Sequence, residues 1–207
     1  MLLAFDTCLD RTYIGISDNK TFSDYIIVEN EGSTYHSAFL ISNIREILKR
    51  NNLTPNDIKT IATDIGPGSF TGIRACMTVA KVMANQLKLK TIGISSLEIL
   101  SKINQPEKQQ LVLLDARKNK AYAWHNKILG AIPIEELKEK VATNEYSIIT
   151  DDAMFEIFKP ICKDIVSYTK IKHNLAKNII EIANGKDSSE YKNLEPLYIQ
   201  PPPIFGK

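Results

Sequence analysis

The order of predicted strands and helices in the first half of the chain is the feature that most restricts its fold. Three short apolar segments joined by brief turns predict a meander of strands at residues 2–5, 13–17 and 25–28. Apolar residues at helical spacing then predict helices at 33–50, at 71–87 and from 95 onwards. Strands are predicted between them, at 60–65 and 91–94. A meander followed by this alternation predicts an α/β protein whose mixed sheet is covered by helices.

The chain is predicted to divide at a polar segment that contains a proline, residues 104–108. We expect residues 1–104 to form an N-terminal lobe that carries a glycine-rich loop, and residues 105–207 to form a smaller C-terminal lobe. The second lobe is predicted to begin with a strand at 111–115 and to include a helix at 175–183 and an extended tail. Three consecutive prolines in the tail cannot continue a helix.

Charge and cysteine content exclude several classes of function. The 26 basic and 24 acidic residues give a net charge of +2, too small for nucleic-acid binding by bulk charge. The three cysteines, Cys8, Cys76 and Cys162, lie far apart and form no CxxC pair, so neither a zinc site nor a disulfide framework is indicated. Without a long apolar segment or a signal-peptide pattern, the sequence predicts a cytoplasmic protein.

The stretch "GPGSFTGIR", residues 66–74, joins a predicted strand to a predicted helix and allows two interpretations. Backbone N–H groups at a helix start attract anions, and Ser69, Thr71 and Arg74 would add hydroxyls and a positive charge. The mechanical interpretation is a tight bend in which Thr71 caps the helix and Gly72 packs closely against a strand. The spacing fits neither a P-loop nor a dinucleotide-binding loop, and both interpretations stay open.

Two predicted helices carry more apolar surface than one sheet can cover. In the first helix, which Ser33 or Thr34 is expected to cap, an apolar stripe is expected to face the core: Leu40, Ile41, Ile44, Ile47 and Leu48. In the second helix only a narrow stripe is polar. We therefore expect a partner interface on these helices, formed by Phe39, Asn43, Glu46, Ala75, Val79 and Val82.

Several segments resemble the bacterial TsaB (YeaZ) proteins, which take part in making threonylcarbamoyl-adenosine beside the anticodon of tRNA. They are "LLAFDTC", "YHSAFLISNIREIL", "GPGSFTGIRA", "LLDARKNKAY" and "PLYIQ". Cys8 stands where the family usually has serine. The resemblance implies the acetate/sugar kinase–Hsc70–actin (ASKHA) fold, an α/β fold of two lobes, each with a mixed five-stranded sheet and flanking helices.

The resemblance also implies a role and partners. TsaB-like proteins are non-catalytic subunits that bind a catalytic homologue, TsaD, and with it an ATPase, TsaE. The chain would form a homodimer when alone, would meet tRNA through the complex, and would not bind a membrane. No cofactor is expected on this subunit alone, although ATP or ADP at the complex interface stays open. A vestigial phosphate site would comprise Asp6, Thr7, Gly66, Gly68, Ser69, Thr71 and Arg74.

The residues themselves give little support for catalysis or for a metal. No glycine follows Asp6 in the turn, and His36 has Leu40 rather than a second histidine four residues later. We therefore expect no catalytic residues and no metal ligands. Two alternatives remain: a small-molecule kinase/ATPase or glycopeptidase-like hydrolase of the same superfamily, and a direct tRNA-binding module.

Overall fold

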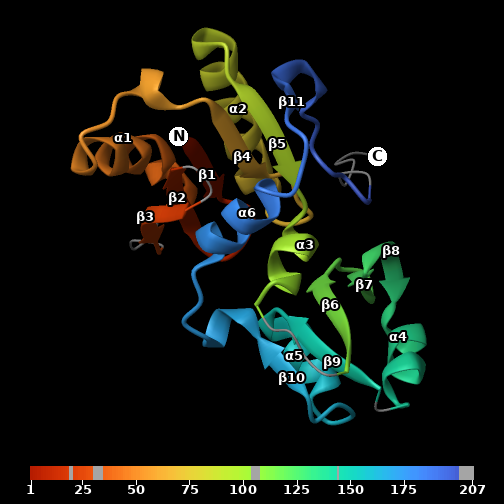
Figure 1. The fold of residues 1–207 in the computed structure, drawn as a ribbon. Coiled ribbons are helices and arrows are strands. Elements are labelled where there is room, and N and C mark those ends of the chain that lie inside the picture. Colours follow the sequence, from red (N-terminus) through yellow and green to blue (C-terminus); the bar gives the residue numbers. More distant parts are fainter. Residues whose placement is uncertain (19–20, 30–34, 104–107, 144, 201–207) are drawn as a thin grey trace. The chain divides into compact units, whose positions relative to one another are not determined.

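The computed structural model describes residues 1–18, 21–29, 35–103, 108–143 and 145–200, which form two compact units (Figure 1). The first unit comprises Met1–Ile99 and Asn174–Pro196, and the second comprises Leu100–His173 with residues 197–200. Each unit is built around a mixed sheet with flanking helices, so the predicted ASKHA-type fold class is confirmed, although the sheet of the first unit has six strands rather than the predicted five. Within the described ranges, no helix has both the length and the apolar character needed to cross a bilayer.

The sheet of the first unit has the order β11-β5-β4-β1-β2-β3. The predicted meander is present, because β2 pairs antiparallel with both β1 and β3, while β1, β4 and β5 run parallel. A short strand from late in the chain, β11, extends the edge beside β5. The strands are β1 (Leu2–Asp6), β2 (Thr12–Asp18), β3 (Thr21–Val28), β4 (Thr60–Asp64), β5 (Lys90–Ile94) and β11 (Ser189–Glu190).

Helices cover both faces of this sheet. Helices α1 (Leu40–Arg50) and α2 (Phe70–Leu87) pack on the face that carries Ile14 and Ile16 of β2. Gly15 points the opposite way, since side chains of a strand alternate between faces. Its missing side chain admits Ala176 of α6 (Leu175–Ala183), because a Cβ at Gly15 would lie 2.9 Å from the Ala176 Cβ. Helix α3 (Ser96–Ser101) follows β5.

The position of α6 differs from the sequence-based prediction, which placed 175–183 in the C-terminal lobe. Helix α6 packs on β1, β2, β4 and β5, and the buried Asn178 side chain donates to the Ile99 carbonyl at 3.0 Å. Residues 174–196 therefore belong to the first unit. Instead of one boundary at 104, the chain crosses between the units three times, after Ile99, His173 and Pro196. The reason is that the second face of the first sheet needs an apolar cover, which α6 supplies with Leu175, Ile179 and Ile182.

The start of α1 also differs from the prediction. The helix begins at Leu40 after a short 3₁₀ turn at His36–Phe39, and the caps proposed at Ser33 and Thr34 lie outside the described residues. Leu40, Ile44, Ile47 and Leu48 are buried as predicted, but Ile41 is 68% exposed. Ile41 lies at the border of the apolar stripe, beyond the part of the helix that the sheet covers.

The sheet of the second unit has the order β10-β9-β6-β7-β8. Its strands are β6 (Gln109–Asp115), β7 (Lys120–His125), β8 (Lys127–Pro133), β9 (Tyr146–Thr150) and β10 (Ile165–Ser167). Helices α4 (Ile134–Val141) and α5 (Asp152–Phe158) bury their apolar residues against it, around Leu111, Leu137, Ile148 and Phe158. Strand β8 is not predicted from the sequence, because only Asn126, at φ 57°, separates it from β7.

Candidate functional site

The glycine-rich loop begins where β4 ends and leads directly into α2. Gly66 has φ 98°, which favours glycine, and Ser69 is the residue that caps the helix. The Ser69 hydroxyl accepts a hydrogen bond from the Gly72 N–H at 3.3 Å. The predicted cap, Thr71, instead lies exposed inside the first turn, because the helix begins one residue earlier than expected, at Phe70.

The glycines of the loop allow close packing against the turn that follows β1. The Ser69 N–H donates to the Cys8 carbonyl at 2.8 Å, and the Thr7 hydroxyl donates to the Gly72 carbonyl at 2.7 Å. A Cβ at Gly68 would overlap the Cys8 carbonyl, and one at Gly72 would overlap the Thr7 carbonyl. Backbone therefore fills the space beside the first turn of α2, which supports the mechanical interpretation of the loop.

The residues suggested for a vestigial phosphate site are only partly brought together. Asp6 and Thr7 are fully buried and meet the loop through the contacts of the β1 turn, while Gly68 and Ser69 are exposed. Arg74 is exposed, with its guanidinium carbon 5.5 Å from the centre of the Phe70 ring. A phosphate-binding role for this set stays a prediction.

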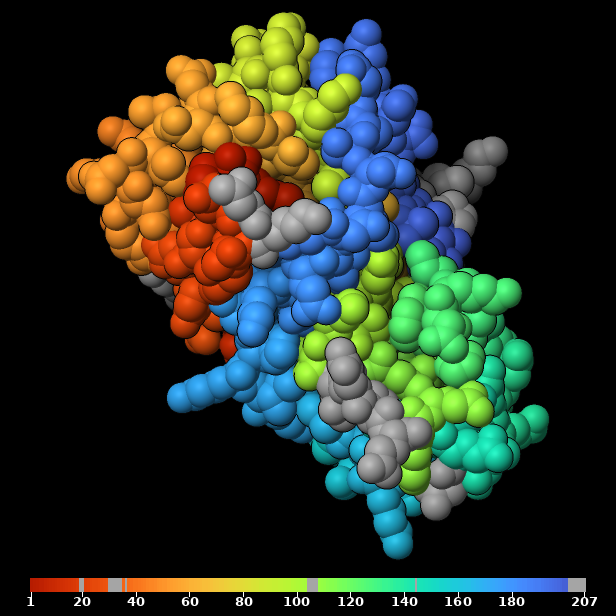
Figure 2. Space-filling view, viewed as in Figure 1, coloured from red at the N-terminus to blue at the C-terminus, as the bar shows by residue number. Residues whose placement is uncertain are grey.

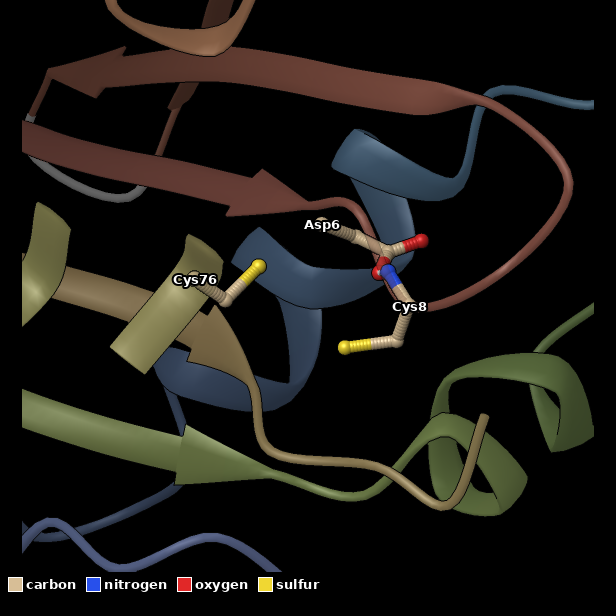
Figure 3. A group of neighbouring side chains, drawn as sticks. All are labelled: Asp6, Cys8 and Cys76. Atoms are coloured by element: carbon tan, nitrogen blue, oxygen red, sulfur yellow. Dashed lines mark hydrogen bonds between the residues drawn. The ribbon is translucent and has the colours of Figure 1, made fainter. Parts of the chain in front are cut away.

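A buried polar cluster, which we call the Asp–Cys cluster, lies beneath the loop and comprises Asp6, Cys8, Asp64 and Cys76. One Asp6 oxygen accepts from the Cys8 N–H at 2.5 Å, and Asp64 accepts from the Gly66 N–H at 2.6 Å and from the Ser96 hydroxyl. Figure 3 shows Asp6 and Cys8 at the end of β1, with Cys76 approaching them from α2. Sequence reasoning missed this cluster because 68 positions separate the two cysteines (76 minus 8).

The cluster has the electrostatics of a site closed to water. Burial, and then the charge of Asp64, raise the pKa of Asp6 well above its usual value. Burial raises the pKa of Asp64 to about 6 against the hydrogen bonds from Gly66 and Ser96 that lower it. Asp64, with a pKa of about 6, is mostly ionised at neutral pH, and its charge disfavours a phosphate anion beneath the loop because like charges in a poorly solvated site repel.

The two thiols of the cluster differ. Burial, followed by its hydrogen bond to Cys76, raises the pKa of the Cys8 thiol. Burial also acts to raise the pKa of Cys76, but hydrogen bonds from Cys8, Thr7 and Thr63 outweigh it, so the pKa of Cys76 is lowered. Cys76 is therefore the group of the pair that more readily carries negative charge.

A groove of about 540 Å³ lies along α1 and the segment that follows it, with Met83 of α2 at its side, on the surface of the first unit. Its lining is mainly apolar with a basic rim, formed by Ile41, Ile44, Arg45, Leu48, Lys49, Leu53, Thr54, Pro55 and Met83. Ile41, which lines it, is 68% exposed. Figure 2 shows α1, in orange, on the molecular surface.

The residues predicted for a partner interface lie around these two helices with unequal exposure. Glu46 is exposed, Val82 is 56% exposed, and Ala75 and Val79 are half-buried. Phe39, which was predicted to belong to this interface, is half-buried in the 3₁₀ turn, and its carbonyl accepts from the Asn43 side chain at 2.9 Å. Ile41, assigned to the core from its spacing, is the more exposed side chain.

Comparison with protein-family models gives a match over residues 23–183 to the family described as "TsaD: tRNA N6-adenosine threonylcarbamoyltransferase". A curated relative from Buchnera aphidicola subsp. Schizaphis graminum, named tRNA threonylcarbamoyladenosine biosynthesis protein TsaB, is 30% identical over 125 residues, covering 59% of this chain and 58% of the relative. The protein of the same name from Buchnera aphidicola subsp. Baizongia pistaciae is 34% identical over 102 residues, covering 48% of this chain and 44% of the relative. The chain thus spans about half the length of these relatives.

Among solved structures, YeaZ from Pseudomonas aeruginosa is similar across nearly the whole fold. The TM-score is 0.71 at 19% identity, with 95% of this chain and 98% of that chain covered. At this identity the likeness concerns the fold, and it includes both units.

Proposed function

The chain belongs to the family of the model described as TsaD, within which its curated relatives are named TsaB, and we propose that it is a TsaB (YeaZ) protein, a non-catalytic subunit required for the threonylcarbamoyl-adenosine modification of tRNA. The printed names of its relatives support a role in the biosynthesis of this nucleoside. Its contribution would be to bind and support a TsaD-like catalytic homologue, with a TsaE-like ATPase joining the complex. tRNA would meet the subunit only through that complex.

The observation that carries the proposal is the apolar groove along α1. Ile41 exposes 68% of its surface there, next to the half-buried Met83. Burying one such side chain contributes about 1.5–3 kcal/mol, and exposed apolar patches with polar rims mark interaction sites. Arg45 and Lys49 add positive charge to the rim, which favours a partner with acidic groups at matching positions.

We propose that the same groove accepts a second copy of this chain when the catalytic homologue is absent. Val82 of α2, 56% exposed, would extend the apolar contact beyond the groove. A helix pair from each partner would then form a four-helix interface. Competition between the two partners follows from their shared surface, so adding the homologue is expected to dissociate the homodimer.

The absence of catalysis is part of the proposal. The backbone of Thr7 and Cys8 fills the space beside the glycine loop. Asp6, the acidic residue of the suggested vestigial phosphate site, is fully buried. The purified chain is therefore expected to hydrolyse neither ATP nor peptides and to bind no nucleotide alone. ATP turnover that copurifies with the chain through successive columns would contradict this part.

The experiment that tests the function is depletion of the protein in its native cells, followed by mass spectrometry of digested tRNA. Loss of threonylcarbamoyl-adenosine, restored by the wild-type chain, is the expected result. Normal levels of the nucleoside after depletion would overturn the assignment.

A pair of matched variants then tests the groove. Ile41→Glu would replace the apolar contact with a charge that must lose its hydration at the interface, so it should abolish copurification with the homologue and fail to restore the nucleoside. Ile161→Glu makes the same change at an isoleucine that is 42% exposed in the second unit and should behave like wild type. If Ile41→Glu folds and still binds the homologue, the interface lies elsewhere.

A further inference from the structure

The Asp–Cys cluster contains three metal-ligating side chains that converge from two elements. A carboxylate oxygen of Asp6 and the sulfur atoms of Cys8 and Cys76 all lie within 4.8 Å of one another. All three residues are buried, with exposed fractions of 0%, 2% and 0%. In Figure 3 the sulfur of Cys8 points towards the Cys76 side and that of Cys76 towards the Asp6 and Cys8 side.

Part of this cluster lacks a hydrogen-bond partner. Among the described residues, no N–H or permanent O–H group donates to the second carboxylate oxygen of Asp6, Oδ2, which is buried, and only a proton shared with the Asp64 carboxyl would give it a hydrogen bond. Such an atom in the interior costs free energy unless something compensates it. Asp64 interacts electrostatically with all three donors, so the site gathers acidic groups and contains no basic side chain among these partners.

We propose that Asp6, Cys8 and Cys76 bind a zinc ion. Thiolate sulfur selects zinc over hard cations such as magnesium, and two cysteines with a carboxylate supply three of the four positions of a tetrahedral site. The ion would offset the negative charge of two thiolates and one carboxylate. Asp64 stays outside the ligand set, since Gly66 and Ser96 already hold its carboxylate.

The separations of the donors suit an ion of this size. Because no two of the three donors are more than 4.8 Å apart, some point lies within about 2.8 Å of all of them, compared with a Zn–S bond of ~2.3 Å. Movements of about 0.5 Å by the sulfur atoms and about 0.6–0.8 Å by the carboxylate oxygen are enough. The Thr7 N–H donates to the Cys76 sulfur at 3.2 Å, the kind of outer hydrogen bond that orients a metal-bound thiolate.

The burial of the site determines when zinc would enter. Neither sulfur is open to solvent, so the ion is expected to bind as the chain folds rather than to add to the folded protein. Once bound, it would join the end of β1 to α2 and raise the stability of the first unit. This role is independent of the proposed tRNA function.

The test uses the full chain, unfolded in chelator and refolded with Zn²⁺, with Co²⁺ or without metal. Refolding with zinc should leave about one ion per chain after desalting, and refolding with cobalt should give thiolate-to-cobalt charge-transfer absorption. The zinc-refolded chain should also unfold at a higher denaturant concentration than the metal-free chain. These three measurements need no variant, and metal-refolded chains that show none of the three effects would overturn the proposal.

Variants then locate the ion. Cys8→Ser and Cys76→Ser should each lose the absorption and weaken zinc binding by roughly 100-fold or more, since even outer partners of a metal site contribute 10–100-fold. Cys162→Ser is the matched control, because Cys162 is equally buried but lies in the second unit. Zinc retained equally by all three variants would place the ion elsewhere. If zinc has no effect, a proton shared by Asp6 and Asp64 compensates the cluster instead.

Discussion

Replacing Gly72 by alanine tests whether the glycine loop serves packing rather than ligand binding. Gly72 lies in the first turn of α2, where alanine would ordinarily stabilise the helix by about 1 kcal/mol. Here the added Cβ would overlap the carbonyl of Thr7 and crowd the Cα of Cys8. Both are backbone atoms of the turn after β1, so they cannot move aside as a flexible side chain could.

The expected loss follows from the contacts that must shift. Overpacking of this kind costs about 1–3 kcal/mol. Separating the turn from α2 also weakens the bonds from Thr7 Oγ1 to the Gly72 carbonyl, at 2.7 Å, and from the Ser69 N–H to the Cys8 carbonyl, at 2.8 Å. At about 1 kcal/mol each, and after subtraction of the helix gain, the net destabilisation is roughly 2–4 kcal/mol.

The assay is urea unfolding of the metal-free chain, followed by circular dichroism. Gly185→Ala provides the matched control, because a Cβ there would meet only the Ile182 carbonyl at an ordinary 3.6 Å; its free energy of unfolding should change by less than about 0.5 kcal/mol. If Gly72→Ala is as stable as wild type or more stable, the close packing of the loop is not what requires glycine. Measured binding of inorganic phosphate by the wild type, lost in the variant, would then favour the anion interpretation.

Three further predictions concern other parts of the fold. Ser69→Ala removes the cap of α2 and should lower the free energy of unfolding by about 1 kcal/mol in the same urea assay; an unchanged value would mean that the 3.3 Å bond to Gly72 contributes nothing. Burial acts to raise the pKa of Asp24, but hydrogen bonds from Asn51 and Arg50 outweigh it and lower that pKa. At pH values above the ordinary carboxyl pKa of about 4, the ionised Asp24 therefore stabilises the folded state by up to about 1 kcal/mol, and this stabilisation is lost as the pH falls through the lowered pKa. In Asp24→Asn the free energy of unfolding should fall less steeply with decreasing pH; the same dependence on pH as in the wild type would refute the pairing. Phe158→Ala empties part of the second core and should cost about 3–5 kcal/mol, which hydrogen exchange should register in β9 but not in β1.

The sequence by itself determined the local elements and the family. Turn residues and apolar alternation located the β1–β2–β3 meander, and helical spacing located α2 to within one residue of its start. These signals are local, since the buried face of a strand or helix is formed by residues two to four positions apart in the sequence. The "GPGSFTGIRA" segment, which pointed to the family, is likewise contiguous in the chain.

Tertiary structure alone decided which surfaces each element meets. Periodicity predicted an apolar face on α6 but could not indicate which sheet this face covers. It also assigned Ile41 to the core, although Ile41 lies just outside the buried part of α1. Cys8 and Cys76 showed no pattern because ligand spacing is visible only when the ligands share one element or loop. They meet because the glycines at 68 and 72 let α2 approach the turn after β1, a contact between backbones that leaves no periodic trace in the sequence.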